Sequence, residues 1–384
     1  MKDNTIVTHA GNRPFENHGI VNPPVYHAST VLSETLEQRI DRSKAKVRYG
    51  RAGTPTTFAL EDAMSALEQA HGTILASSGL AAITMALSAF VQTGDHILVT
   101  DSTYTPTRNF CNQTLSRLGV ETEYFDPLTG SGITELIREN TRLVWTECPG
   151  SQTFDVQDLP AIVEAAHARD VIVLTDNTWS GGYFRKPLTE GVDVSVQAAT
   201  KYIVGHSDVM MGTIACNEAT FEKVRQSSSL FGMCCGPDDV YLALRGLRTI
   251  SVRMDRHHES GIRVAEWLQS RPEVSQVMHP ALPQDPGHEL WKRDFTGASG
   301  LFGFVLKEGD RTKLSAMMDH MELLGMGSSW GGYESLLIPS WPEQSRTVTN
   351  WEVSGQCMRI HVGLEDPDDL IADLEAGFER MKKA

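Results

Sequence analysis

The sequence predicts an α/β protein with a large, mostly parallel sheet domain and a smaller C-terminal α+β domain. Short apolar runs alternate with segments of helical periodicity over 57–217, which is the pattern of parallel strands joined by crossover helices. Near residue 250 this alternation changes, and the later strands and helices predict a second unit. A chain of 384 residues can bury two hydrophobic cores. We therefore expect domains over 56–250 and 251–384, with residues 1–55 as an N-terminal arm.

The arm shows neither helical nor strand periodicity and is rich in Asn, Pro, Gly and Thr, so it is either disordered or an extended segment that lies on another surface. The motif over 47–56 favours the extended segment. In an extended conformation Tyr49 and Arg51 lie on the same side. An arginine fork matches a phosphate, and a tyrosine hydroxyl adds a donor. A solvated loop is the alternative interpretation of this motif.

The first strand of the sheet domain, over 72–80, passes directly into a helix over 81–91. Ser78, Gly79 and Leu80 therefore lie at a helix N-terminus, where free backbone N–H groups and the helix dipole favour a phosphate. An ordinary serine cap beside a glycine turn is the alternative. The other elements of this domain are predicted as helices over 57–70, up to 118 and after Asp158, and as strands over 96–100, 143–146, 171–175 and 193–197.

Two strands end in side chains that suit an aromatic cofactor. The apolar run 171–175 leads to Asp176, and ligands of open α/β sheets bind at that edge. A carboxylate there can keep the pyridine nitrogen of pyridoxal 5'-phosphate (PLP) protonated, although an Asp-Asn pair also forms ordinary turns. Tyr104 follows the strand over 96–100 and can stack on a bound ring or simply pack.

Lys201 follows the strand over 193–197 and is surrounded by small and apolar residues, with no other lysine nearby in the sequence. A desolvated lysine has a lowered pKa, and its free amine forms a Schiff base with a carbonyl. The hypothesis is that Lys201 carries PLP. The chemistry of PLP needs an acid and a lysine close together, and here Asp176 ends one strand and Lys201 follows the next.

The C-terminal domain is predicted to contain strands over 275–278, 301–306 and 358–362 and a last helix that begins at Asp366-Pro367. Within the last strand Arg359 and His361 share one face. Arg359 can hold a substrate carboxylate with two hydrogen bonds, and a solvent-facing charge is the alternative. His257 and His258 are predicted to be surface residues of a helix.

Composition limits the partners of this chain. The formal net charge of -15 argues against nucleic acid and against an anionic membrane surface, and no apolar run is long enough to span a bilayer. The six cysteines form no CxxC pair and are predicted to be reduced, buried thiols, with the adjacent Cys234 and Cys235 unpaired. There is no apolar signal core at the start and no metal-ligand spacing. We expect a cytoplasmic protein with a small-molecule substrate.

The motifs together resemble the Cys/Met-metabolism PLP-dependent enzymes of fold type I. The resemblance rests on Ser78-Gly79, Tyr104, Asp176 in TDNTW and the stretch ATKYIVGHSD around Lys201, and it covers nearly the whole chain. It implies a seven-stranded sheet in the large domain. The segments SWGGYES from Ser329 and MRIHVGLED from Met358 resemble those of bacterial cystathionine β-lyases.

The resemblance also implies a role for each candidate residue. Lys201 forms the Schiff base and later moves the substrate's α-proton, Tyr104 stacks on the cofactor ring, and Asp176 pairs with the pyridinium. The implied phosphate ligands are Ser78, Gly79, Leu80 and Thr200, together with Tyr49 and Arg51 of a neighbouring subunit. The implied substrate ligands are Ser329, Trp330 and Arg359.

The implied activity is β-elimination of L-cystathionine, or a related cysteine S-conjugate, to a thiol (homocysteine), pyruvate and ammonia, in a homotetramer built from dimers with shared active sites. The alternatives are a γ-lyase or a γ-replacing transferase of the same family, such as a homoserine-ester sulfhydrylase or cystathionine γ-synthase, and a non-catalytic regulatory PLP protein. Ala52, Asn109 and Ser328 depart from the enterobacterial β-lyases, which carry arginine, an acidic residue and tyrosine there. The first two positions are thought to contact the distal end of cystathionine, so the preferred cysteine conjugate stays open.

Overall fold

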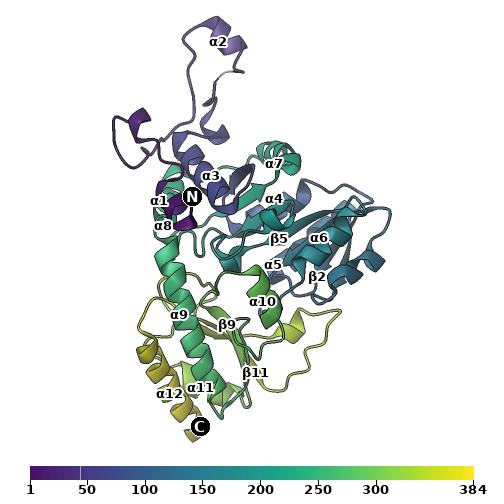
Figure 1. The fold of residues 1–384 in the computed structure, drawn as a ribbon, viewed down its shortest axis with the longest axis vertical. Coiled ribbons are helices and arrows are strands. Elements are labelled where there is room, and N and C mark those ends of the chain that lie inside the picture. The colour runs from purple at the N-terminus through teal and green to yellow at the C-terminus, as the bar shows by residue number, and fades with distance from the viewer. Residues whose placement is uncertain (44) are drawn as a thin grey trace.

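The computed structural model describes residues 1–43 and 45–384 and contains two β-sheets. In Figure 1 the larger sheet lies above and to the right of the smaller sheet, and the long helix α9 (Ile250–Gln269) runs down the left side of the smaller one. Ile250 and Met254 of α9 pack into the core next to the larger sheet, whereas Val264 and Leu268 pack into the core of the smaller one. The predicted boundary at 250/251 stays a prediction, since α9 contributes to both cores.

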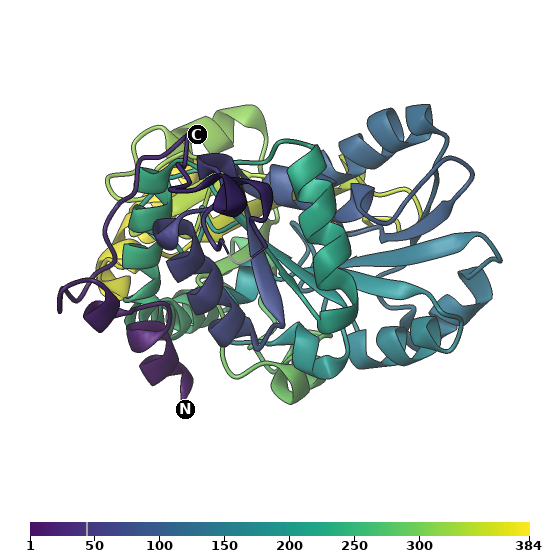
Figure 2. The same cartoon turned by 90° about the horizontal axis from the view of Figure 1, so that it is seen from above.

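The larger sheet has seven strands in the order β1-β7-β6-β5-β4-β2-β3, which confirms the fold class. The strands are β1 (Gly72–Ala76), β2 (His96–Thr100), β3 (Glu121–Phe125), β4 (Thr141–Glu147), β5 (Ile172–Asp176), β6 (Val194–Gln197) and β7 (Gly212–Cys216). Only β7 runs against its neighbours β1 and β6, so the other strands all point the same way. Figure 2 shows helices on both sides of this sheet.

Cover on both faces explains why the central strands are almost wholly apolar. The helices of this part of the chain are α3 (Pro55–Glu68), α4 (Gly79–Ser88), α5 (Thr105–Asn109), α6 (Leu159–His167), α7 (Glu218–Leu230) and α8 (Pro237–Leu247). The predicted helix up to 118 is α5, which continues as a π-helical turn over Phe110–Leu115 and a 3₁₀ turn over Ser116–Leu118. The hydrophobic pattern did not predict β3, because this strand lies at the edge of the sheet and its sequence, ETEYF, is polar.

The smaller sheet is antiparallel, in the order β10-β11-β9-β8. Its strands are β8 (Val274–Met278), β9 (Leu301–Leu306), β10 (Leu336–Pro339) and β11 (Gln356–His361), and its other helices are α10 (His288–Asp294), α11 (Arg311–Met318) and α12 (Pro367–Lys383). β10 is short and was not predicted. No helix in the described ranges 1–43 and 45–384 has both the length and the hydropathy of a membrane span.

Three expectations about burial and order were wrong. The arm contains a helix, α1 (Asp3–His9), which has only one buried residue, Val7, and therefore shows no hydrophobic periodicity in the sequence. A second helix of the arm, α2 (Leu36–Ile40), projects from the body of the molecule (Figure 1). His257 is fully buried, because its face of α9 packs toward Val362, whose carbonyl oxygen lies 2.9 Å from Nδ1. Cys234 is exposed, although all six thiols are free, as expected.

Candidate active site

The carboxyl ends of the parallel strands bring the predicted residues to one edge of the larger sheet. β1 ends just before Ser78, β2 just before the loop with Tyr104, β5 at Asp176, and β6 just before Lys201. Because these strands run in the same direction, their ends meet at the same edge although the residues are far apart in sequence.

Lys201 is partly buried in a turn after β6, and its ammonium faces the C-terminal domain. Its Nζ lies 2.6 Å from Oγ of Ser329 and 5.3 Å from the ring centre of Trp330. Burial and, to a smaller extent, the charge of Arg359 lower the pKa of Lys201 from 10.5 to about 8, although the charge of Asp176 opposes the shift. A substantial fraction of this amine is therefore neutral near physiological pH, which is the form that attacks a carbonyl.

Two carboxyl groups lie side by side near Lys201. Asp176 on β5 is paired in register with Glu147 on β4. Burial raises the pKa of both groups, and the charge of Asp176 raises that of Glu147 further. Glu147 accepts the backbone N–H of Tyr104 at 2.6 Å, and thereby holds the loop that presents the tyrosine ring. The sequence pattern alone did not predict a role for Glu147, although its place at the carboxyl end of a strand, like that of Asp176, was a usable signal.

Asp176 has one oxygen free for a ligand. Its Oδ1 accepts the N–H and the hydroxyl of Thr178, at 2.9 and 2.5 Å. Within the described residues 1–43 and 45–384, Oδ2 accepts no hydrogen bond. A buried carboxylate with a free oxygen, one strand away from a partly neutral lysine, fits the protonated pyridine nitrogen of PLP.

The start of α4 also fits a phosphate. Ser78 caps the helix by accepting the N–H of Ala81 at 3.0 Å, which leaves the N–H groups of Gly79 and Leu80 without partners inside the helix. A Cβ atom on Gly79 would lie 2.4 Å from the Cβ of Ala198, so the helix start packs directly on the turn that leads to Lys201. The hydroxyl of Thr200 accepts the N–H of Met211 at 2.8 Å, so its predicted contact with phosphate stays a prediction.

The C-terminal domain supplies the predicted substrate side. Arg359 on β11 donates to the carbonyl oxygen of Ser328 at 2.7 Å, and its charge acts on the pKa of both Lys201 and Tyr104. Arg359 also donates to the carbonyl oxygen of Ser329 at 3.3 Å, and the hydroxyl of this serine lies 2.6 Å from Nζ of Lys201. Gly331, which follows Trp330 in the sequence, has a φ of +82°. A Cβ atom at this position would lie 2.9 Å from Cα of Lys201, so only glycine allows the backbone of the C-terminal domain to come this close to Lys201.

Tyr49 and Arg51 are not brought to Lys201 within this chain. Tyr49 precedes a 3₁₀ turn over Gly50–Ala52, so the motif is not extended as we expected. Arg51 donates to the carbonyl oxygen of Ser229 at 2.9 Å and lines a cavity of about 1240 Å³ beside α7 that does not include Lys201. Their predicted contact with a neighbouring subunit's phosphate stays a prediction.

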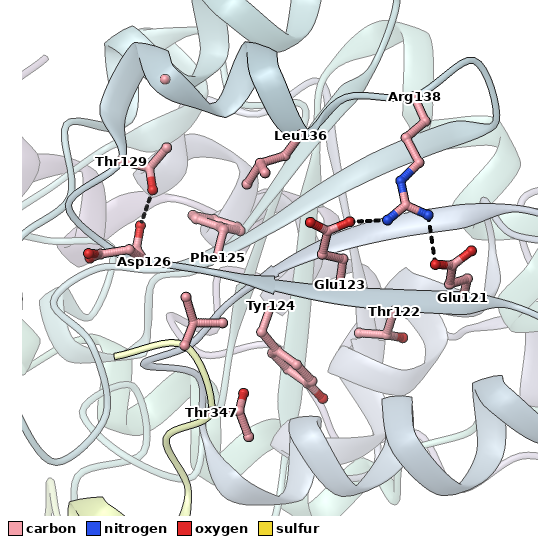
Figure 3. Close-up of a pocket in the computed structure, with 12 residues that line it drawn as sticks. Glu121, Thr122, Glu123, Tyr124, Phe125, Asp126, Thr129, Leu136, Arg138 and Thr347 are labelled. Carbon is pink, nitrogen blue, oxygen red and sulfur yellow. Dashed lines mark hydrogen bonds and ion pairs between the residues drawn. The ribbon is translucent and has the colours of Figure 1, made fainter. Parts of the chain in front are cut away.

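A separate cavity of about 650 Å³ lies along β3 (Figure 3). Arg138 bridges Glu121 and Glu123 on one side of it, and Thr347 of the C-terminal domain lies on the other. None of the predicted site residues lines this cavity, so it is distinct from the site around Lys201.

Comparison with known proteins agrees with this geometry. The model of the Cys/Met metabolism PLP-dependent enzyme family matches residues 4–379. The chain is 45% identical over 390 residues to cystathionine beta-lyase MetC of Escherichia coli K12, covering 99% of both chains. It is 43% identical over 387 residues to the cystathionine beta-lyase of Haemophilus influenzae, covering 98% of both.

A solved structure has the same fold. The cystathionine gamma-lyase of Lactobacillus plantarum, complexed with L-serine, superposes with a TM-score of 0.91 and 28% identity over the full length of both chains. The chain is thus similar to β-lyases at a higher identity than to this γ-lyase, whereas the fold is common to both.

Proposed function

The chain belongs to the Cys/Met metabolism PLP-dependent enzyme family, and on that premise we propose that it is a carbon–sulfur β-lyase that cleaves L-cystathionine. Cystathionine and water would give homocysteine, pyruvate and ammonia. The observation that carries the proposal is that Lys201 contacts Ser329 and Trp330 of the other domain, where Arg359 also donates to Ser329. The identity to the β-lyases of two bacteria supports β- over γ-elimination.

Each site residue has a defined task in this proposal. When bound, PLP supplies an electron sink that stabilises negative charge at the substrate Cα. Asp176 would hold its pyridine nitrogen protonated, the N-terminus of α4 would hold its phosphate, and Tyr104 would cover its ring. Arg359 would bind the substrate carboxylate and so orient the Cα–H bond toward the Nζ of Lys201.

Lys201 would then move the proton. Its amine, with a pKa lowered to about 8, accepts the Cα proton in its neutral form and returns a proton in its charged form. Ser329 lies at hydrogen-bond distance from Nζ and would fix the direction of the amine. Trp330 would shield the ammonium on one side from water.

The reaction products test the proposal. Purified holoenzyme is incubated with L-cystathionine, and the 2-oxo acid is identified. Pyruvate is expected, whereas 2-oxobutanoate alone would overturn β-elimination. A homoserine ester offered with a thiol tests the γ-replacing alternative. Because Ala52 and Asn109 are exposed and lack the expected charges, cystine, cysteine and S-alkylcysteines are compared with cystathionine by kcat/KM.

The assembly and the location are further parts of the proposal. We infer a homotetramer of dimers in which the arm of one subunit reaches the site of another. Phe15, Leu32, Leu36 and Ile40 are exposed on the arm in the single chain, which supports a covering partner. A cytoplasmic location is proposed from the free state of the six thiols.

A further inference from the structure

A segment of the C-terminal domain reaches across to the larger sheet. We call residues 345–349, which lie between β10 and β11, the strap. In Figure 3 the strap passes the carboxyl end of β3, with Thr347 close to Tyr124. Arg346 of the strap forms an ion pair with Asp155 of the large domain at 2.7 Å and also bonds Thr153. The strap is thus attached to a domain other than its own.

The main attachment is Asp101, which follows β2 and is 1% exposed. Its carboxylate accepts the backbone N–H groups of three consecutive strap residues, Thr347, Val348 and Thr349, at 2.9 to 3.1 Å. The hydroxyls of Thr347 and Thr349 donate to it as well, each at 2.9 Å. Burial alone would raise the pKa of Asp101, but these N–H groups outweigh burial and hold that pKa below its usual range.

Asp101 belongs to the loop that carries Tyr104. Arg108 donates to the carboxylate of Asp101 at 2.7 Å and to the hydroxyl of Thr347 at 3.2 Å, so residues on both sides of Tyr104 meet the strap. Glu147 also fixes this loop, because its carboxylate accepts the backbone N–H of Tyr104. The position of the tyrosine ring therefore depends on the strap as well as on its own domain.

The other end of the connection is Arg359. The strap is part of the loop that joins β10 to β11, and Ile338 of β10 is paired with Arg359 of β11. The strap is thus continuous with the strand pair that carries the guanidinium. It links Arg359, which is proposed to bind the substrate carboxylate, to Tyr104, which is proposed to cover the ring, although Arg359 lies on the smaller sheet and Tyr104 follows a strand of the larger one.

We propose that Asp101 is a positioning residue for the reaction, which sets Arg359 relative to Tyr104 by fastening the strap to the Tyr104 loop. The inference deepens the proposed function and rests on it. Asp101 touches neither reacting atoms nor cofactor in this role. Its substitution is expected to weaken the binding of amino-acid substrates more than it slows their turnover.

The test is the Asp101→Asn holoenzyme beside a matched control, Asp373→Asn. Asp373 is 8% exposed and also accepts three consecutive backbone N–H groups, those of Glu322, Leu323 and Leu324, but entirely within the C-terminal domain. In both variants an amide NH₂ replaces an oxygen that faces backbone donors. The loss of stability is therefore similar in kind, and only Asp101→Asn loosens the contact between the domains.

Steady-state kinetics provide the first measurement. For Asp101→Asn we expect the KM for cystathionine to rise about tenfold or more while kcat falls less than about threefold. Asp373→Asn is expected to keep both constants near wild type. An equal change in the two variants, or a fall in kcat with unchanged KM, would overturn the positioning role.

Limited trypsin digestion provides a second measurement that needs no substrate. The side chain of Arg346 is 7% exposed while the strap is fastened. Cleavage after Arg346 should be slow in wild type and in Asp373→Asn and fast in Asp101→Asn. If cleavage follows this pattern but no cystathionine is consumed by the wild type, the proposed function fails and the fastening stands. Equal cleavage of all three proteins contradicts the fastening.

A milder variant covers the case in which Asp101→Asn does not fold. Thr347→Val with Thr349→Val removes two hydroxyl donors but leaves the backbone N–H groups on the carboxylate, so the charge of Asp101 stays satisfied. A smaller rise in KM and intermediate cleavage at Arg346 are expected. Wild-type values for both would contradict the proposal.

Discussion

At the scale of single residues, the chemistry depends on the environment of ionisable groups. Lys201 has an unremarkable side chain, but burial and the nearby Arg359 lower its pKa to about 8. Asp176 opposes that shift, yet its own charge is disfavoured by burial. The site therefore contains a base that is partly neutral and an acid that needs a cationic partner, which is what a protonated pyridine ring provides.

The lowered pKa of Lys201 predicts a pH dependence of the stability of the apoprotein. Below about pH 8 the lysine is charged in both states, and its burial destabilises the fold. From about 8 to 10.5 the folded state has lost a proton that the unfolded state still binds, so the free energy of unfolding rises with pH. Urea unfolding should show this rise for wild type relative to Lys201→Met. Parallel curves for the two proteins would contradict it.

A second variant checks the cause of the shift. In Arg359→Met the positive charge that helps to lower the pKa of Lys201 is gone. The rise in stability of the apoprotein should therefore begin at a higher pH and be smaller than in wild type, because the unfolded-state pKa of 10.5 still sets its upper limit; urea unfolding at several pH values measures it, and an unchanged onset would contradict the role of Arg359.

Arg359 itself is predicted to determine substrate affinity. Replacing its guanidinium by methionine removes a bidentate contact with a carboxylate, so the KM should rise by roughly 30-fold or more. Arg256→Met is the control, because among residues 1–43 and 45–384 Arg256 donates only to the carbonyl oxygen of Glu365, at 3.1 Å. A similar KM in both variants would remove Arg359 from the substrate site.

At the scale of elements, the contact between the start of α4 and the turn after β6 fixes the distance between the phosphate site and the lysine. Gly79 makes the contact possible, since a Cβ would lie 2.4 Å from that of Ala198. The strands bring the two segments to one edge, and the missing side chain lets them touch.

Gly79→Ala is therefore expected to lower both the stability and the affinity for PLP. Overpacking at this contact should cost about 1–3 kcal/mol of unfolding free energy. Gly325→Ala is the matched control, because a Cβ there meets Leu336 at an ordinary 3.5 Å. Urea unfolding and titration of the apoprotein with PLP measure the two effects. Equal behaviour of the two variants would argue against a close contact at α4.

At the scale of the whole molecule, the arm and the strap are the segments that leave their own domain. The strap is attached within the chain, through Asp101 and Asp155. The arm instead carries exposed apolar side chains, and its Arg51 lines a cavity that does not include Lys201. A site completed by another subunit accounts for both features of the arm.

Subunit mixing tests this arrangement. Lys201→Ala and Arg51→Ala should each be inactive or nearly so. After unfolding and refolding together in equal amounts, half of the dimers would be mixed, and one of the two sites in each would carry neither substitution. About a quarter of wild-type activity should then return. Failure to recover activity would mean either that Arg51 does not reach the neighbouring subunit's site or that each site is formed within one subunit.

The sequence by itself determined the fold class, the strands that precede Ser78, Tyr104, Asp176 and Lys201, the strand that contains Arg359, and the identity of Lys201, Tyr104, Asp176 and Arg359 as candidates. These followed because periodicity and chemical type are local properties. Glu147, the strap on Asp101 and the burial of His257 were decided only by the tertiary structure. Each arises from contacts between segments far apart in the chain, such as Asp101 with Thr349, and no local pattern records which distant surface a side chain meets.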